Sequence, residues 1–289
     1  MNVNGGTNVV GLIGNPIKHS FSPQMHNCAF NKLNLNYIYL PFEVQGTNLR
    51  KAINGAKSLN IKGLNVTIPH KVNVLKYLDE IDYTAKQIGA VNTIKFINKQ
   101  DKIIAKGYNT DSIGAILALK EKTSLKDKNI VICGAGGASR AIAFELLNNN
   151  INSLTLINRN QDKVKSLSND LKRNNLNALI KTASLLDIDK YLKNADILID
   201  TTPVGMSPHN DDESIIKANQ LHSDLIVNDI VYNPIETSLI KEAKLAGCKT
   251  VSGIKMLLYQ GVESFKIWTG INPPLDLMEK TLLNIINNK

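Results

Sequence analysis

Disulfide scaffolds and cysteine-based metal sites need cysteines that this chain lacks. Its three cysteines, Cys28, Cys133 and Cys248, are far apart and show neither a CxxC pair nor a Cys/His ligand spacing. We therefore expect no metal site. We expect the thiols to be reduced and buried as small hydrophobic groups, as in a cytosolic protein.

Long apolar segments are also missing. No apolar run approaches the roughly 18–20 residues that a membrane-spanning helix needs. The first residues, MNVNGGTNVVGLIG, contain no basic stretch followed by an apolar one, so we expect no signal peptide. These two absences predict a protein with no membrane partner.

Arginine is scarce although the formal net charge is +9. Only four of the 34 cationic residues are arginines, and the lysines are scattered along the chain. Proteins that recognise nucleic acids usually rely on arginine forks or on a basic stripe with interleaved aromatic residues, and neither pattern is present. We expect no nucleic-acid partner, and a mild positive field would instead steer an anionic small molecule toward the protein.

The length and composition indicate a folded protein of one large or two medium domains. The chain has 289 residues, and single hydrophobic cores stop growing near about 250–300 residues. Hydrophobic residues make up 43% and charged residues 20%, as in ordinary globular proteins.

The first 70 residues alternate between strand and helix patterns. The expected strands are Val9–Ile13, Tyr37–Phe42 and Leu64–Ile68, and the expected helices follow Pro23 and span Leu49–Leu59. A βαβαβ order with short connections is typical of a parallel sheet.

The stretch GLNVTIPHK, residues 63–71, concentrates polar groups at the end of one strand. Asn65 and Thr67 have the period-2 spacing that directs side chains to one face, and Pro69 stops the strand. Lys71 then begins a helical pattern over residues 72–78. An amine, a hydroxyl and an amide in one small volume suggest an anion or polyol site. The alternative is an ordinary strand–Pro–helix junction with a solvated lysine.

Other polar residues near predicted element ends also allow two interpretations. Ser22 precedes Pro23 and would make a good N-cap, but with Ser20 it could hold a carboxylate. Asn92 resembles a turn or cap residue, and Asp111 the N-cap of the next helix.

A C-terminal helix is predicted over Ile254–Trp268, where apolar residues form one stripe. Gln260 falls off this stripe. It would face solvent unless a ligand binds there.

A glycine-rich turn follows the predicted strand Lys128–Cys133. The turn is Gly134-Ala135-Gly136-Gly137-Ala138, and an apolar helix, Ala141–Leu147, comes directly after it. Strand, glycine turn and helix are the context of a dinucleotide-binding motif, because the turn brings backbone N–H groups close to a pyrophosphate. Ser139 replaces the third glycine and is small enough for close helix packing.

The next strand, Ser153–Ile157, indicates which dinucleotide binds. It is followed by Asn158-Arg159-Asn160, with Lys163 one helical turn further on. An NAD-specific site would carry a carboxylate here, whereas two cations favour the 2′-phosphate of NADP. The alternative is a basic turn without a ligand. Further strands near residues 195–203 and 225–230 complete a sheet within residues 112–252.

Taken together, several motifs resemble the shikimate dehydrogenase family over essentially the whole chain. They are GNPIKHSFSPQMHN, NVTIPHK, GAVNT, GYNTD, GAGGASRA, NR, TPVGM, VYNPIET and GIKMLLYQG, in this order. The chain departs from the family where Asn160 replaces a common threonine and Lys163 a common arginine.

The resemblance implies a two-domain α/β fold. A parallel-sheet substrate domain, residues 1–111, is completed by residues 253–289, and a Rossmann-type NADP domain spans residues 112–252. It also implies a role for each matching residue. The expected catalytic pair is Lys71 and Asp111. The expected substrate-binding residues are Ser20, Ser22, Asn65, Thr67, Lys71, Asn92, Asp111, Tyr232 and Gln260. The expected NADP-binding residues are Gly134, Ala135, Gly136, Gly137, Ala138, Asn158, Arg159, Lys163, Thr202, Ile230 and Gly253.

The implied reaction is the NADPH-dependent, reversible reduction of 3-dehydroshikimate to shikimate in aromatic amino acid and chorismate biosynthesis. Lys71 would give and take the proton, with Asp111 beside it. One alternative is a quinate/shikimate dehydrogenase that also uses NAD, and another is a non-catalytic NADP-binding sensor. We expect a cytoplasmic monomer or homodimer.

Overall fold

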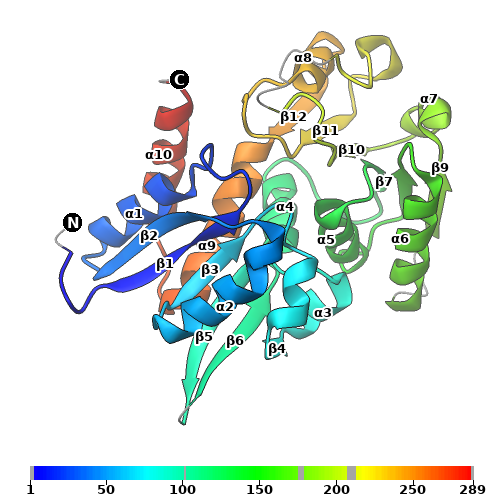
Figure 1. Ribbon diagram of the computed structural model, residues 1–289. Coiled ribbons are helices and arrows are strands. Elements are labelled where there is room, and N and C mark those ends of the chain that lie inside the picture. Colours follow the sequence, from blue (N-terminus) through cyan, green and yellow to red (C-terminus); the bar gives the residue numbers. More distant parts are fainter. Residues whose placement is uncertain (1–2, 101, 175–178, 207–212, 288–289) are drawn as a thin grey trace. The chain divides into compact units, whose positions relative to one another are not determined.

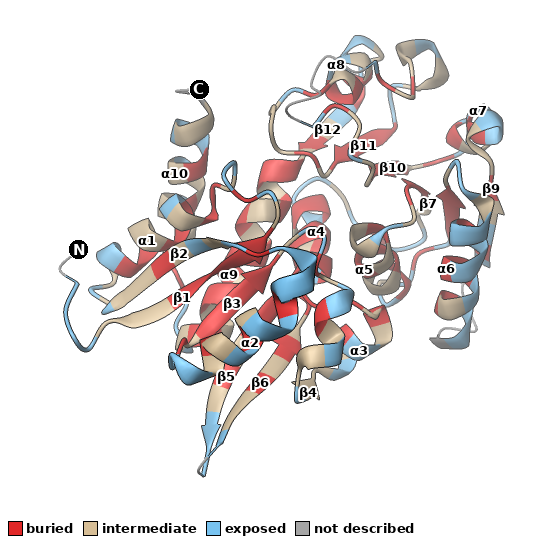
Figure 2. Cartoon of the chain, viewed as in Figure 1, coloured by how far each residue is buried: buried red, intermediate tan, exposed pale blue. Residues whose placement is uncertain are grey.

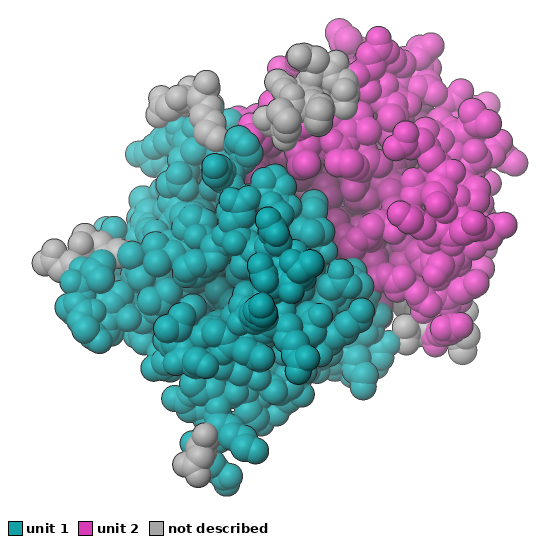
Figure 3. All heavy atoms as spheres, in the orientation of Figure 1, with its two compact units in different colours: residues 1–110, 260–289 teal, residues 111–259 magenta. Residues whose placement is uncertain are grey.

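The computed structural model describes residues 3–100, 102–174, 179–206 and 213–287. The chain forms two compact units (Figures 1 and 3). The first contains residues 1–110 and 260–289, and the second contains residues 111–259. The second boundary falls inside helix α9 (Gly253–Thr269), seven residues after the start of that helix, where we had expected the boundary.

The first unit begins with the predicted alternation of strands and helices. Its elements are β1 (Asn8–Gly14), α1 (Ser22–Lys32), β2 (Tyr37–Glu43), α2 (Leu49–Ser58), β3 (Gly63–Val66), β4 (Glu80–Ile81), α3 (Tyr83–Ile88), β5 (Thr93–Lys99), β6 (Lys102–Tyr108), the end of α9 and α10 (Leu275–Asn287). β1 pairs in parallel with β2 on one side and with β3 on the other, as predicted. Figure 2 shows β3 buried along its whole length.

The sheet of the first unit is mixed, which the sequence-based prediction of a parallel sheet missed. The strand order is β2-β1-β3-β5-β6-β4, and β5 runs antiparallel to both of its neighbours. Only residues 100–101 separate β5 from β6, and so short a connection joins antiparallel strands, whereas parallel strands need a crossover of a dozen or more residues. The antiparallel direction puts the start of β5 at the same sheet edge as the ends of β1, β3 and β6.

Two local predictions in this unit were wrong in detail. The strand in GLNVTIPHK ends at Val66 instead of Ile68, and the expected helix over residues 72–78 is a short 3₁₀ turn, Asn73–Tyr77. Helix α9 covers the predicted range of residues 254–268 and extends it by one residue at each end.

The second unit is a doubly wound parallel sheet. Its elements are α4 (Asp111–Lys120), β7 (Asn129–Cys133), α5 (Gly137–Leu147), β8 (Ser153–Ile157), α6 (Gln161–Asn174), β9 (Leu179–Ala183), α7 (Ile188–Leu192), β10 (Ile197–Asp200), β11 (Ile226–Asp229), α8 (Ser238–Leu245), β12 (Lys249–Ser252) and the first part of α9. The strand order is β12-β11-β10-β7-β8-β9, with every pair parallel.

Both faces of this sheet are covered. Along β7, Ile130 and Ile132 belong to one apolar cluster, while Val131 and Cys133 belong to another. Alternate residues of a strand point to opposite faces, so the two clusters lie on the two sides of the sheet. The strand order reverses between β7 and β10, and ligands of such sheets bind at the carboxyl ends of the strands on either side of this point.

The burial of the cysteines largely agrees with the prediction of buried thiols. Cys133 and Cys248 are buried, Cys28 is half-buried, and none forms a disulfide. Within the described part of the chain, no helix is both long and apolar enough to cross a membrane.

Candidate functional site

A cavity of about 260 Å³ opens at the reversal point of the second sheet. It is lined by Cys133, Gly134, Ala135, Gly136, Ile157, Asn158, Arg159, Lys163, Leu185, Thr201, Thr202, Pro203, Val204 and Ile215. Most of these residues lie at or just after the carboxyl ends of β7, β8 and β10, and Leu185 follows β9. The cavity therefore brings together the glycine turn, the Asn-Arg pair and Thr202, which were predicted to bind the cofactor. Gly137, Ala138, Ile230 and Gly253 are not among its lining residues.

The glycine turn is fixed by close backbone packing. Gly134 has a φ of +112°, and a Cβ there would lie 2.1 Å from Thr201 Oγ1. The Thr201 hydroxyl donates to the Cys133 carbonyl at 2.7 Å, and the buried Ser139 hydroxyl donates to the Gly134 carbonyl at 2.9 Å. Ser139 thus fits the position of the third glycine and also ties the helix to the turn.

The start of α5 fits a phosphate group. Gly136 precedes the helix and Gly137 begins it, and a Cβ at either position would meet no atom within 4 Å. No side chain among the described residues caps this helix end. The first backbone N–H groups of a helix have no intrahelical partner, so they can bind an anion that approaches over the glycines.

The basic turn after β8 also fits the predicted role. Arg159 and Lys163 are exposed at the cavity, and the Asn158 side chain accepts a hydrogen bond from the Arg159 N–H at 2.8 Å. Asn160, which departs from the family pattern, accepts from the Lys163 N–H at 3.0 Å and caps α6 as a threonine could. Arg140, in contrast, pairs with Asp170 at 2.8 Å and links α5 to α6.

Ile230 and Gly253, which directly follow β11 and β12, lie against each other. A Cβ on Gly253 would lie 2.3 Å from the Ile230 carbonyl oxygen, so only glycine allows α9 to start against this backbone. Tyr232 follows in the same loop, where burial raises the pKa of its phenol.

Two buried carboxyl groups lie at the ends of neighbouring strands in this unit. Asp200 and Asp229 are opposite each other at the ends of β10 and β11. Burial and the neighbouring charge of Asp229 raise the pKa of Asp200 to about 7, and burial raises that of Asp229 to about 6. Asp200 accepts hydrogen bonds from the Thr202 N–H at 2.9 Å and from the Thr202 hydroxyl at 3.1 Å, so it fixes a residue that lines the cavity. Sequence reasoning missed this role.

In the first unit, the predicted substrate residues gather at one edge of the sheet. Asn65 and Thr67 lie at the end of β3, and Asn92 directly precedes β5. The Thr67 N–H donates to the Ile13 carbonyl of β1 at 2.9 Å, and a Cβ on Gly14 would lie 2.3 Å from the Thr67 side chain. The close approach at Gly14 holds Thr67 against the end of β1.

The turn that carries Lys71 is anchored on both sides. The buried His70 ring forms a hydrogen bond with the Val44 carbonyl at 2.6 Å, and the Lys71 carbonyl accepts from the Val91 N–H at 2.8 Å. Lys71 itself is half-buried. An anchored backbone and a half-buried residue disfavour the alternative of a freely solvated lysine.

Ser20 and Ser22 follow β1 at this edge. Ser22 is the first residue of α1 and not its N-cap, which is Phe21, and no described side chain caps this helix. The Ser20 hydroxyl accepts from the Ser22 N–H at 3.3 Å. Because Ser22 has no capping role, the second interpretation, a carboxylate site, remains as a prediction.

Gln260 differs from the default expectation of a solvent-facing residue, because it is buried. One turn later on α9, the Ser264 hydroxyl donates to the Gln260 carbonyl and contacts Asn65, Thr93 and Thr110 at 2.8–3.2 Å. This contact places Gln260 near the edge that carries Asn65.

Asn65 is more fully engaged with the protein than a ligand-binding residue would need to be. Its Oδ1 accepts from the Tyr39 hydroxyl at 2.8 Å, and its Nδ2 lies within 3.2 Å of three acceptors, namely Ser264 Oγ, Thr93 Oγ1 and the Asn92 carbonyl. Sequence reasoning missed Tyr39, Thr93 and Ser264, although Thr93 belongs to the GAVNT motif.

Asp111 and Tyr232 belong to the second unit. Asp111 is buried and is the first residue of α4.

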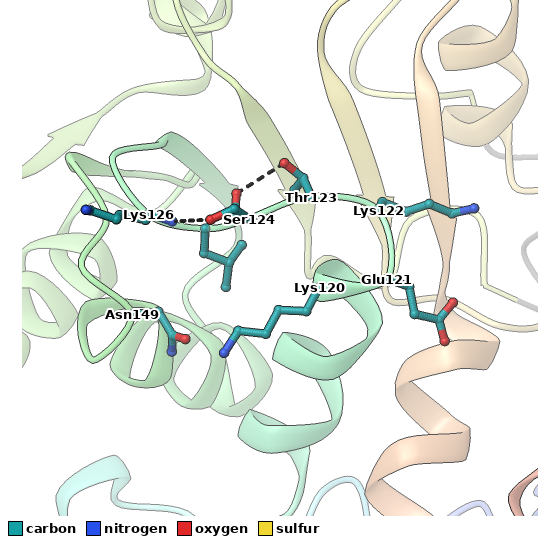
Figure 4. Close-up of a pocket in the computed structure, with 8 residues that line it drawn as sticks. Lys120, Glu121, Lys122, Thr123, Ser124, Lys126 and Asn149 are labelled. Carbon is teal, nitrogen blue, oxygen red and sulfur yellow. Dashed lines mark hydrogen bonds between the residues drawn. The ribbon is translucent and has the colours of Figure 1, made fainter.

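A larger depression of about 680 Å³ lies elsewhere on the second unit, between the end of α4 and the start of β7. It is lined by Lys120, Glu121, Lys122, Thr123, Ser124, Leu125, Lys126 and Asn149, none of which was predicted to bind a ligand. Figure 4 shows Lys122 and Lys126 pointing away from each other. Because these charged groups diverge, the depression does not form a converging anion site. Among the described residues, no His, Cys, Asp or Glu cluster is arranged to hold a metal ion.

The strand order, the glycine turn and the cavity at the reversal point define a dinucleotide-binding α/β protein, whose other α/β unit carries a lysine, amides and hydroxyls along one sheet edge. Comparison with known proteins gives the family. Residues 12–94 match the shikimate dehydrogenase substrate binding domain, residues 116–239 match shikimate / quinate 5-dehydrogenase, and residues 253–283 match the shikimate 5′-dehydrogenase C-terminal domain. The chain belongs to the shikimate dehydrogenase family.

Individual relatives match along nearly the full length. The chain is 61% identical over 280 residues to a shikimate dehydrogenase (NADP(+)) of Methanobrevibacter smithii, covering 97% of this chain and 98% of that protein. A crystal structure of a shikimate dehydrogenase in complex with NADP+ has a TM-score of 0.92 and 49% identity, covering 99% of this chain and 98% of that one. A structure of the Listeria monocytogenes shikimate 5-dehydrogenase in complex with shikimate and NAD has a TM-score of 0.89 and 35% identity, covering 98% of both chains.

Proposed function

We propose that this protein catalyses the reversible, NADPH-dependent reduction of 3-dehydroshikimate to shikimate, a step toward chorismate and the aromatic amino acids. The observation that carries the proposal is the anchored Lys71 at the same sheet edge as Thr67 and Asn92, in a chain whose second unit has a dinucleotide cavity. A relative that is 61% identical bears the same activity in its name.

The substrate carboxylate binds to the hydroxyls of Ser20 and Ser22, with Tyr232 near it. The ring hydroxyls bind to Thr67, Asn92 and Gln260. The Asn65 amide is hydrogen-bonded to Tyr39, Thr93 and Ser264, so Asn65 contributes to substrate binding by holding neighbouring side chains in place. A ligand with one carboxylate and several hydroxyls matches this set of neutral donors and acceptors.

NADPH supplies the hydride for the ketone carbon. Lys71 protonates the ketone oxygen as charge develops on it, and in the reverse direction it accepts the proton from the substrate hydroxyl. Asp111 orients Lys71 and binds a substrate hydroxyl. Support for this role comes from Thr110, the residue directly before Asp111. The Thr110 N–H donates to Asn92 Oδ1 at 2.7 Å, and this bond fixes the backbone at Thr110.

The cofactor is held by the second unit. Backbone N–H groups of residues 134–138 bind the pyrophosphate at the start of α5, while Asn158, Arg159 and Lys163 bind the ribose 2′-phosphate. Thr202, Ile230 and Gly253 line the rest of the cofactor site.

The test is the variant Lys71→Ala, assayed by reduction of NADP+ in the presence of shikimate. We expect kcat to fall by about 10²–10⁴, the usual contribution of general acid–base catalysis, with a much smaller change in KM for shikimate. The control is Lys76→Ala, which removes an exposed lysine five residues away and should leave kcat unchanged. Near-normal turnover by Lys71→Ala would refute its catalytic assignment.

A second candidate is a quinate/shikimate dehydrogenase that uses NAD as well. It is favoured by the lysine at position 163, where a family arginine is common. We expect kcat/KM to be higher for NADP+ than for NAD+ and higher for shikimate than for quinate. A preference for NAD+ would contradict the roles of Arg159 and Lys163.

The non-catalytic sensor is the least supported alternative, since Lys71 and Asp111 are both present. Absence of any shikimate-dependent NADP+ reduction by the pure protein would favour it. We further propose that the enzyme is cytoplasmic and works as a monomer or homodimer, which size-exclusion chromatography with light scattering would distinguish.

A further inference from the structure

We propose that Tyr39 and Ser264 are positioning residues for the substrate-binding edge, acting through the buried amide of Asn65 on Asn92 and Gln260. The inference rests on the proposed function, because it takes Asn92 and Gln260 as substrate ligands. The residues that transmit the effect form one buried set, which we call the polar cluster: Tyr39, Asn65, Asn92, Thr93, Thr110 and Ser264.

The orientation of the Asn65 amide is fixed by a backbone carbonyl, a group that can only accept a hydrogen bond. The Asn92 backbone carbonyl, which can only accept, lies 3.2 Å from Nδ2, and the Tyr39 hydroxyl donates to Oδ1 at 2.8 Å. Nδ2 also faces Thr93 Oγ1 at 3.0 Å and Ser264 Oγ at 2.9 Å, so its two hydrogens are shared among these three acceptors. Each hydroxyl must then direct its own hydrogen elsewhere.

The oxygens of the two hydroxyls lie 2.8 Å apart, so one of the two donates to the other. The remaining hydrogen goes to a predicted ligand residue, either to Asn92 Oδ1, 3.1 Å from Thr93 Oγ1, or to the Gln260 carbonyl, 2.9 Å from Ser264 Oγ. Thr110 adds its N–H to Asn92 Oδ1 at 2.7 Å, while Asn92 Nδ2 donates to Thr110 Oγ1 at 2.9 Å. The bonds to Thr110 therefore distinguish the two sides of the Asn92 amide, and the network joins Tyr39 to Asn92 through Asn65 and Thr93.

Without the Tyr39 hydroxyl, the buried Asn65 Oδ1 loses this donor, and the Asn92 carbonyl at 3.2 Å from Nδ2 is left to oppose a flip of the amide. A flipped amide would present Oδ1 to Thr93 and Ser264, whose hydrogens would then turn toward Asn65. Asn92 would lose one of the donors that hold its Oδ1. Because a buried network is cooperative, a change at Tyr39 reaches Asn92 through Asn65 and Thr93.

The HN pair of the SPQMHN motif accounts for the position of Tyr39. The His26 ring stacks on the Tyr39 ring with centroids 4.6 Å apart and 8° between planes. Asn27 accepts from the Tyr39 N–H at 2.8 Å and donates to the Tyr39 carbonyl at 3.0 Å, although β2 is an edge strand with no second neighbour in the described sheet. His26 thus fixes the ring of Tyr39, and Asn27 fixes its backbone. Neither residue was predicted to bind the substrate or the cofactor, so the contact with Tyr39 gives the HN pair its role.

The test compares Tyr39→Phe with Tyr37→Phe in steady-state kinetics. Tyr37 lies on the same strand, with its ring stacked on Phe30 at 5.2 Å, and its hydroxyl makes no hydrogen bond to any described residue. We expect Tyr39→Phe to raise KM for shikimate about 10-fold, equivalent to roughly 1.4 kcal/mol, with KM for NADP+ unchanged and kcat changed less than about 3-fold. Tyr37→Phe should match the wild type in KM for shikimate, in KM for NADP+ and in kcat.

Ser264→Ala gives an independent measurement if Tyr39→Phe fails to fold. It should also raise KM for shikimate, and the double variant should raise it by less than the product of the two single effects, since both act through Asn65. A merely structural role would lower the melting temperature and the active fraction without changing KM for shikimate.

The outcomes separate this inference from the proposed function. If the wild type oxidises shikimate and both variants keep its KM for shikimate, the positioning role is refuted while the function stands. If KM for NADP+ rises equally, the effect is not specific to the substrate edge and the inference fails as well. A wild type that neither binds nor oxidises shikimate would overturn both.

Discussion

Replacing Asp200 with asparagine should make the stability of the protein less dependent on pH. Asp200 is only 2% exposed, and burial together with the charge of Asp229 raises its pKa from 3.8 to about 7. A carboxyl group with a raised pKa binds its proton more tightly in the folded state than in the unfolded state. Its contribution to stability is therefore fully present below about pH 4 and is lost as the pH rises through about 7.

The size of this loss follows from the shift. About three pKa units at 1.36 kcal/mol each give a cost of at most about 4 kcal/mol for ionising Asp200 in the folded protein. Asparagine has the same shape, stays neutral and can still accept the Thr202 N–H bond, with its Nδ2 group donating to the Thr202 hydroxyl. The variant should therefore avoid most of this cost.

Urea denaturation followed by circular dichroism at pH 5 and at pH 8.5 would measure the effect. We expect the free energy of unfolding of the wild type to fall more between these pH values than that of Asp200→Asn, by about 2.7 kcal/mol, because about two pH units separate pH 5 from the raised pKa of about 7. Asp224→Asn, which changes an exposed aspartate before β11, is the matched control and should parallel the wild type. Parallel pH profiles for the wild type and Asp200→Asn would refute the assigned cost.

Two further substitutions test the glycine turn and a buried ring. Gly134→Ala places a methyl group 2.1 Å from Thr201 Oγ1 at a φ of +112°, and should raise KM for NADP+ at least about 10-fold with little change in KM for shikimate; calorimetric NADP+ binding equal to the wild type would contradict this. His26 has two ring nitrogens without a partner in the described structure, and burial lowers its pKa to about 3. Because the unfolded chain takes up this proton below about pH 6.5, stability falls as the pH drops toward 3. His26→Leu should therefore lose about 3 kcal/mol less than the wild type between pH 7 and pH 4 in urea titrations, and an equal loss would exclude His26 as the cause.

The sequence alone determined the features that depend on neighbours in the chain. The strand before Gly134, the turn and the following helix lie within residues 129–147, so their pattern predicted the dinucleotide motif. Asn158, Arg159 and Lys163 were predicted as cofactor residues because they closely follow the next strand, and they line the cavity. The βαβαβ start was predicted for the same reason. The roles of Ser20, Ser22, Tyr232 and the Lys71–Asp111 pair came from the family resemblance and remain predictions.

Only the tertiary structure decided the features that join distant segments. Thr93 and Ser264 are 171 residues apart in sequence and 2.8 Å apart in space, and no local pattern marks either as part of the polar cluster. The pKa of Asp200 depends on Asp229 across a strand pair, and Gln260, off the apolar stripe of its helix, is nevertheless buried. Periodicity records which face of an element is apolar, but burial and hydrogen bonding depend on what packs against that face, and this is set by the whole fold.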